Sequence, residues 1–152
     1  RAQTRVPLAT GERLTSRYHF APLCVERLVD VIMPDVVHVG GISELRKIAI
    51  LAEAFRVDVS PHNPQSEVST LASMHVCMST PNCTILEIGS GQDPFWQDLF
   101  YGVHFSYDRG YANPPSRPGL GIDLDESVAA KYPFKEKDWH TLRTPDGAYV
   151  DR

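Results

Sequence analysis

The stretch Val29-Asp30-Val31-Ile32-Met33-Pro34-Asp35 decides the fold, and the stretch Arg56-Val57-Asp58-Val59-Ser60-Pro61-His62 resembles it. The first stretch continues an apolar run with several β-branched residues, which is typical of a strand buried on both faces. Both stretches end at a proline followed directly by a polar residue. Because proline has no N–H to donate, it disturbs a sheet least at the end of a strand. We therefore expect two strands, over 28–33 and 56–60, each followed by a polar side chain.

Helical patterns lie between the predicted strands. Residues 42–55 carry apolar side chains on one stripe at helical spacing and charged side chains on the other face, with Ser43 as the expected N-cap. The same reading predicts further helices over 20–28 and 66–78, and further strands over 5–10 and 83–86. This alternation of strands and helices indicates βαβ units and a parallel sheet.

The chain changes character after Gly89. Residues 94–105 are rich in aromatic side chains, residues 111–121 are rich in proline and glycine, and residues 125–131 suit one short helix. Aromatic side chains need a surface to bury against. We therefore divide the chain into strand–helix units over 1–93, a wrap over other structure over 94–139, and a polar tail over 140–152.

The composition excludes several classes of protein. The 152 residues carry 15 Lys and Arg against 19 Asp and Glu, with a formal charge of −4. Without a basic run or an apolar stretch of about 20 residues, the sequence predicts neither a nucleic-acid nor a membrane partner. Cys24, Cys77 and Cys83 lie in or beside apolar runs and form no CxxC pair. They suit reduced buried thiols in a cytoplasmic protein better than a disulfide or metal ligands.

Four ionisable residues each follow a predicted strand: Glu12, Asp35, His62 and Glu87, at intervals of 23, 27 and 25 residues. One strand–helix unit of an eight-unit barrel of about 250 residues has that length. The carboxyl ends of parallel strands lie on one face of the sheet. The spacing therefore predicts that these four side chains converge on one crevice.

Each of these side chains also has an ordinary structural interpretation. A strand-end Asp or Glu often caps the next helix or pairs with an arginine, and His62 between two prolines suits a rigid turn. The regular spacing of the four residues favours a functional site, because chance gives no reason for such a repeat. A carboxylate beside an imidazole fixes the tautomer of the ring and raises its basicity, and further carboxylates can hold a hard divalent cation.

Several segments resemble successive strand ends of the mandelate racemase subgroup of the enolase superfamily: Ala9-Thr10-Gly11-Glu12-Arg13, residues 33–42, Ser60-Pro61-His62 and Ile85-Leu86-Glu87. Residues 117–133 are similar to the C-terminal segment of its sugar-acid dehydratases, and the whole is most similar to the galactonate dehydratase type. The resemblance implies an α/β fold, namely the C-terminal half of a TIM-type (β/α) barrel with parallel strands, plus an extended C-terminal wrap that contacts the barrel and a capping domain.

The resemblance also implies a role for each site residue. Glu12 matches a carboxylate ligand of an essential Mg²⁺, and Asp35 with His62 matches a dyad that moves a proton at the α-carbon of the substrate. Glu87 matches a carboxyl group that bonds to the substrate carboxylate or to the enediolate as it forms. His38 either touches the substrate or packs within its glycine-rich loop. The implied reaction is the dehydration of a sugar acid to a 2-keto-3-deoxy acid.

Alternatives stay open at this point. The same dyad and metal would serve a racemase or a cycloisomerase, and a half-barrel could act as a non-catalytic assembly module. The family has two further metal ligands on earlier strands that this sequence lacks. We therefore expect a C-terminal piece of a longer, homo-oligomeric enzyme, inactive without its N-terminal half, with a small sugar acid as substrate. His19, His75, His104 and His140 match no motif, and we expect them at the surface or in packing.

Overall fold

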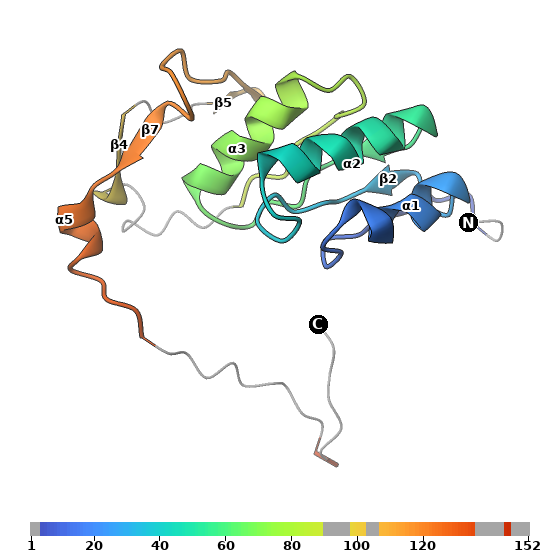
Figure 1. Cartoon of the computed structure of the whole chain (residues 1–152), viewed down its shortest axis with the longest axis horizontal. Coiled ribbons are helices and arrows are strands. Elements are labelled where there is room, and N and C mark those ends of the chain that lie inside the picture. The colour runs from blue at the N-terminus through green and yellow to red at the C-terminus, as the bar shows by residue number, and fades with distance from the viewer. Residues whose placement is uncertain (1–3, 90–97, 103–106, 136–144, 147–152) are drawn as a thin grey trace.

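The computed structural model describes residues 4–89, 98–102, 107–135 and 145–146. In its first part, strands and helices alternate in the order β1 (Ala9–Thr10), α1 (Arg17–Val25), β2 (Val31–Ile32), α2 (Ile42–Ala54), β3 (Asp58–Val59) and α3 (Glu67–Met78) (Figure 1). This order confirms the predicted alternation. The aromatic Phe95 and Trp96, together with His104 and His140, lie outside the described residues. None of the helices described is long and apolar enough to cross a membrane.

The three short strands form one parallel sheet in the order β1-β2-β3. Thr10 pairs with Ile32, and Ile32 pairs with Val59, so the three strands end level with one another. The main chain therefore leaves all three strands at the same edge of the sheet. This register places the predicted strand-end residues side by side.

The fourth predicted strand, over 83–86, is reduced to a single parallel bridge between Val59 and Cys83. The amide of Val59 donates to the carbonyl of Asn82 at 2.9 Å, and the amide of Thr84 donates to the carbonyl of Val59 at 3.2 Å. Pro61 follows two residues later and has no N–H to extend this ladder. The expectation of a full strand was wrong, although the segment does lie next to β3.

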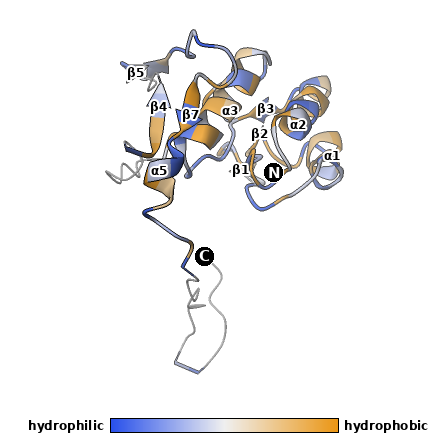
Figure 2. Ribbon diagram, turned by 60° about the vertical axis from the view of Figure 1, so that its left-hand side comes forward, coloured by the Kyte–Doolittle hydropathy of each residue, from blue (hydrophilic) through white to orange (hydrophobic). Residues whose placement is uncertain are grey.

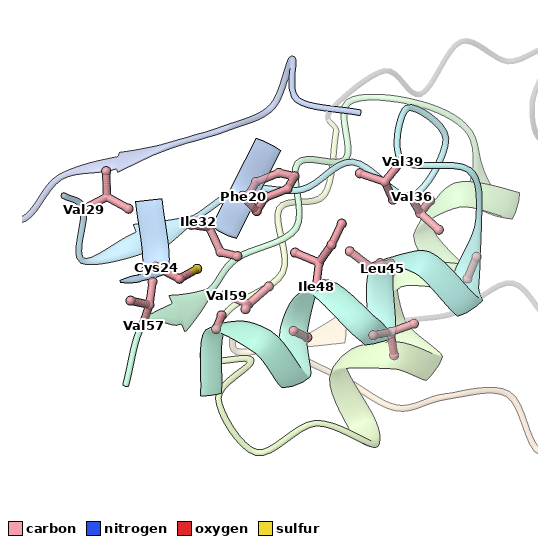
Figure 3. Close-up of a cluster of buried hydrophobic side chains, with 14 residues drawn as sticks. Phe20, Cys24, Val29, Ile32, Val36, Val39, Leu45, Ile48, Val57 and Val59 are labelled. Atoms are coloured by element: carbon pink, nitrogen blue, oxygen red, sulfur yellow. The ribbon is translucent and has the colours of Figure 1, made fainter. Parts of the chain in front are cut away.

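The helices pack against the sheet, and α2 contacts both α1 and α3. The core between the layers is fully apolar at its centre, where Ile32 and Val59 of the sheet meet Phe20 of α1 and Leu45 and Ile48 of α2 (Figure 3). Each of these side chains is fully buried. Burying an aliphatic or aromatic side chain of this size stabilises the fold by roughly 1.5–3 kcal/mol. This packing therefore holds strands β2 and β3 in place, and with them the sheet edge from which the polar residues extend.

Helix α2 begins differently from the prediction. Gly41 with φ 103° is the N-cap, no side chain caps the helix, and Ser43 lies inside the first turn. Gly40 also has a positive φ, of 94°. Two consecutive residues in this conformation favour glycine, and they bring the chain from the strand end into the helix. Ser43 as N-cap was therefore wrong, because the glycine pair rather than a hydroxyl sets the start.

The C-terminal part forms small antiparallel pairs beyond α3 (Figures 1 and 2). Strand β4 (Phe100–Gly102) pairs with β7 (Ile122–Leu124), and β5 (Tyr107–Asp108) pairs with β6 (Tyr111–Ala112). The predicted short helix is α5 (Glu126–Ala129), capped by the Asp125 carboxylate.

The contact of this part with the rest of the molecule includes Leu120, which packs against the core. Tyr111 and Phe134 are exposed. These exposed aromatic rings are what a wrapping segment with a further surface to cover would present. The division of the chain into strand–helix units, wrap and tail stays a prediction.

Candidate active site

Three of the four predicted site residues lie just past the level strand ends, and the fourth follows the segment that bridges to β3. Glu12 is two residues beyond β1, Asp35 three beyond β2, and His62 three beyond β3. Glu87 is four residues beyond Cys83, the residue that bridges to β3. Glu12, Asp35 and His62 therefore leave a common sheet edge, as the spacing predicted. The convergence of all four side chains on one crevice stays a prediction.

Asp35 and His62 form a hydrogen-bonded pair. His62 Nδ1 lies 2.9 Å from Asp35 Oδ2, and the Asp35 side chain is 1% exposed while that of His62 is 22% exposed. The other oxygen, Oδ1, accepts the backbone amides of Val37 at 2.8 Å and His38 at 3.3 Å. Because a carboxylate only accepts hydrogen bonds, Nδ1 carries the proton that it donates to Asp35. Nε2 is then the nitrogen that can take up a proton.

Gln65 is a contact that the sequence did not reveal. Its side-chain amide donates to Asp35 Oδ2 at 3.0 Å, the same oxygen that His62 reaches. Gln65 follows Pro64 in the loop after β3, and no periodicity or motif marks it. Asp35 therefore holds four donors, two of them side chains from the loop after β3 and two of them amides of its own loop.

His38 lies between the dyad and Glu12. Its Nδ1 is 3.0 Å from the backbone oxygen of Glu12 and 3.9 Å from Asp35 Oδ2, and its ring centre is 6.3 Å from that of His62. The side chain is 43% exposed. A hydrogen bond from His38 Nδ1 to the Glu12 carbonyl thus connects the loop after β2 to the main chain after β1. The His38 ring is exposed to solvent beside the dyad.

Glu12 is half-buried, and its Oε2 accepts the backbone amide of Gly11 at 3.1 Å. A carboxylate oxygen is a ligand type that Mg²⁺ prefers, but Mg²⁺ needs near-octahedral coordination. Within the described ranges, no group of three or more His, Cys, Asp or Glu side chains could hold a metal ion. A Mg²⁺ ion at Glu12 would therefore need further ligands from outside the described residues.

Glu87 is joined to the dyad through the main chain. Its Oε2 accepts the backbone amide of Asn63 at 3.0 Å, and Asn63 directly follows His62. The structure thus pairs Asp35 with His62, Glu87 with Asn63, and the Glu12 main chain with His38. His19 and His75 lie on α1 and α3, away from these contacts: His19 is exposed, and His75 is half-buried.

The thiols differ in their surroundings, and all three cysteines are free. Burial raises the pKa of Cys24. A hydrogen bond between the thiols of Cys77 and Cys83 raises the pKa of Cys77 and lowers that of Cys83. Cys77 lies in the last turn of α3 and Cys83 bridges to β3, so this pair lies apart from the strand-end residues.

Known proteins of similar sequence are longer than this chain. It is 39% identical over 153 residues to a "D-galactonate dehydratase family member" of Streptomyces bingchenggensis, covering 99% of the chain and 37% of that protein. It is 34% identical over 157 residues to a D-galactonate dehydratase of Ralstonia pickettii, covering 99% and 41%. The chain therefore spans about two fifths of the length of these relatives.

Solved structures show the same relationship. An enolase from Pantoea ananatis, crystallised with bound D-gluconate and magnesium, superposes with a TM-score of 0.86 at 36% identity, over 97% of this chain and 36% of that one. This likeness confirms the predicted α/β fold as half of a TIM-type (β/α) barrel. A family described as "Enolase C-terminal domain-like" matches residues 1–128. The chain therefore belongs to the enolase C-terminal domain-like family.

Proposed function

We propose that this chain supplies the C-terminal half of the barrel, and one side of the active site, of a Mg²⁺-dependent sugar-acid dehydratase. The observation that carries the proposal is the Asp35–His62 hydrogen bond at the sheet edge, in a chain whose relatives bear the name D-galactonate dehydratase. The substrate is a sugar acid of the galactonate or gluconate type. The rest of the barrel belongs to the same polypeptide, which assembles as a homo-oligomer.

His62 exchanges the proton at the α-carbon of the substrate. Asp35 fixes the ring with Nδ1 protonated, so that Nε2 faces the reaction as the base. When the proton moves onto Nε2, the ring becomes a cation, and the buried Asp35 carboxylate stabilises that cation. Four donors hold this carboxylate, so it needs no rearrangement when the charge forms.

Removing an α-proton from a carboxylate creates an enediolate with a second negative charge. Mg²⁺, bound with Glu12 among its ligands, would supply positive charge to the substrate oxygens. Glu87, held by the Asn63 amide, offers its carboxyl group to the same oxygens from the side of the following strand end. His38 is exposed beside the dyad and contacts the hydroxyl groups of the sugar acid. The β-hydroxyl then takes a proton from a general acid and leaves as water, and the resulting enol tautomerises to a 2-keto-3-deoxy acid.

The decisive experiment replaces His62 by Asn in the complete enzyme. The wild type should convert galactonate or gluconate to a 2-keto-3-deoxy acid, detected as its semicarbazone. His62→Asn should abolish this conversion and also the exchange of the α-hydrogen with deuterium from solvent, followed by NMR. The loss should be at least about 10²- to 10⁴-fold. His19→Asn is the matched control, because His19 is an exposed histidine on α1 whose Nδ1 lies 3.4 Å from the hydroxyl oxygens of Thr15 and Ser16.

Each other outcome selects a different function. Exchange of the α-hydrogen without loss of water in the wild type would assign the site to a racemase or cycloisomerase. Lack of both reactions with every sugar acid tried would leave the assembly module. If His62→Asn blocked dehydration but kept α-hydrogen exchange, His62 would be the acid that expels the hydroxyl group.

A further inference from the structure

The buried side chain of Asn63 uses all of its hydrogen-bonding groups beside the site. It is 1% exposed and lies between His62 and Pro64 in the loop after β3. Its Nδ2 donates to Thr70 Oγ1 at 2.8 Å and to the backbone oxygen of Glu87 at 2.9 Å, and its Oδ1 accepts from Ser69 Oγ at 2.9 Å. Both amide hydrogens and the amide oxygen are thus used, by α3 on one side and by Glu87 on the other.

The main chain of Asn63 reaches the same segment. Its N–H donates to Glu87 Oε2 at 3.0 Å, and its C=O accepts the amide of Gly89 at 3.0 Å. A Cβ added at Gly89 would lie 2.9 Å from the Pro64 carbonyl carbon. Residues 87–89 therefore lie against residues 63–64 so closely that a side chain at position 89 would force the two main chains apart.

These contacts of residues 63–64 with residues 87–89 hold Glu87 in place, which sheet pairing does not do. Asp35 and His62 leave strands that are joined by paired ladders, and their positions follow from the register. The segment that carries Glu87 shares one isolated bridge with β3, four residues before Glu87. Sheet pairing therefore leaves the Glu87 carboxyl unplaced. Four hydrogen bonds between Asn63 and Glu87, Gly89 and Thr70 place it: Asn63 donates three of them, and its carbonyl accepts the fourth from the Gly89 amide.

We propose that Asn63 is a positioning residue that sets the place of the Glu87 carboxyl group relative to His62, with Thr70 as the anchor of its side chain. This inference rests on the proposed function, in which His62 and Glu87 act on the same substrate. Asn63 acts through Glu87. Because Asn63 directly follows His62 in the chain and is bonded to Glu87, any shift of Asn63 moves the Glu87 carboxyl group relative to the His62 ring.

The chain offers a matched control in Asn82. Its Nδ2 also donates to two backbone oxygens, those of Ala49 at 3.1 Å and Val57 at 3.0 Å. The Ala49 oxygen lies in the middle of α2, and the Val57 oxygen lies directly before β3, at the opposite end of that strand from His62. Asn82→Ala therefore removes a comparable pair of hydrogen bonds without touching Glu87.

The experiment compares Asn63→Ala, Thr70→Val, Thr70→Ser and Asn82→Ala in the complete enzyme, each assayed below its own Tm. We expect Asn63→Ala and Thr70→Val to lower kcat about 10- to 100-fold, since a misplacement near 1 Å has that effect. Thr70→Ser keeps the acceptor hydroxyl and should restore kcat to within about threefold of wild type. Asn82→Ala should lower Tm but change kcat less than about twofold. Thr70→Val also decides the matter if Asn63→Ala does not fold.

Crystal structures of the same variants give a readout that needs no turnover. The distance between the Glu87 carboxyl and the His62 ring should change in Asn63→Ala and Thr70→Val and stay the same in Asn82→Ala. An unchanged distance, or an equal loss of kcat in Asn82→Ala, would overturn the inference. If the wild type dehydrates no sugar acid, the proposed function fails, while the crystallographic distances still decide the role of Asn63.

Discussion

Gln65 donates its side-chain amide to Asp35 Oδ2, the oxygen that His62 also reaches, although 30 residues separate Gln65 from Asp35. The amide adds partial positive charge to one side of a buried carboxylate. Because His62 approaches the same oxygen, the two donors fix the direction in which the Asp35 charge points. Gln65 therefore belongs to the surroundings of the dyad.

Gln65→Glu should lower kcat by about three- to tenfold, because it replaces the donor by a carboxylate facing Asp35. A like-charge contact with one exposed partner is worth on the order of 1 kcal/mol. Gln65→Met removes the donor without adding charge and should have a smaller effect. Steady-state kinetics at one pH compare the two variants with the wild type. If both variants keep the wild-type kcat, the Gln65 contact does not influence the dyad.

Asp35→Asn should lower kcat about 10²- to 10⁴-fold with little change in KM. Oδ1 accepts two backbone amides, so the amide oxygen of the variant occupies that place and its NH₂ group faces His62. His62 Nδ1 must then accept, which moves the ring proton to Nε2 and removes the base. Asp58→Asn, at an exposed carboxylate within β3, is the control. Turnover near the wild-type value in Asp35→Asn would contradict the proposed tautomer.

Glu12→Gln should weaken Mg²⁺ binding and dehydration together, because a neutral amide is a poorer ligand for a hard cation than a carboxylate. Isothermal titration calorimetry of the complete enzyme measures the affinity for Mg²⁺ directly. Glu53→Gln, at an exposed position on α2, provides the reference. An unchanged affinity in Glu12→Gln would remove Glu12 from the ligands.

Cys83 should react with iodoacetamide before Cys77 and Cys24. The thiolate is the reactive form, and the hydrogen bond from Cys77 lowers the pKa of Cys83, whereas the pKa of Cys77 and that of the buried Cys24 are raised. As the pH rises, Cys83 is therefore the first of the three to become a thiolate. Tandem mass spectrometry identifies the modified residue at each time point. Cys77→Ala should slow the modification of Cys83, and earlier labelling of Cys24 would contradict this order.

Local patterns in the sequence were enough to predict the alternation of elements and the stripe of α2. The apolar spacing of 42–55 and the structure of α2 (Ile42–Ala54) agree closely, because a helix buries the face that its periodicity defines. The start of α1 lies at Arg17, before the predicted residue 20. Its first turn is polar, so apolar spacing does not detect it.

The sequence by itself also determined that Glu12, Asp35 and His62 leave one sheet edge, since strands of a parallel sheet carry their carboxyl ends on the same side. Their catalytic and metal-binding roles stay predictions. Only the tertiary structure decided which atoms meet: His62 with Asp35 across 27 residues, Glu87 with Asn63 across 24, and Gln65 with Asp35 across 30. Such contacts depend on the path of each loop and on side-chain rotamers, which the packing of the whole sheet edge selects and no local periodicity encodes.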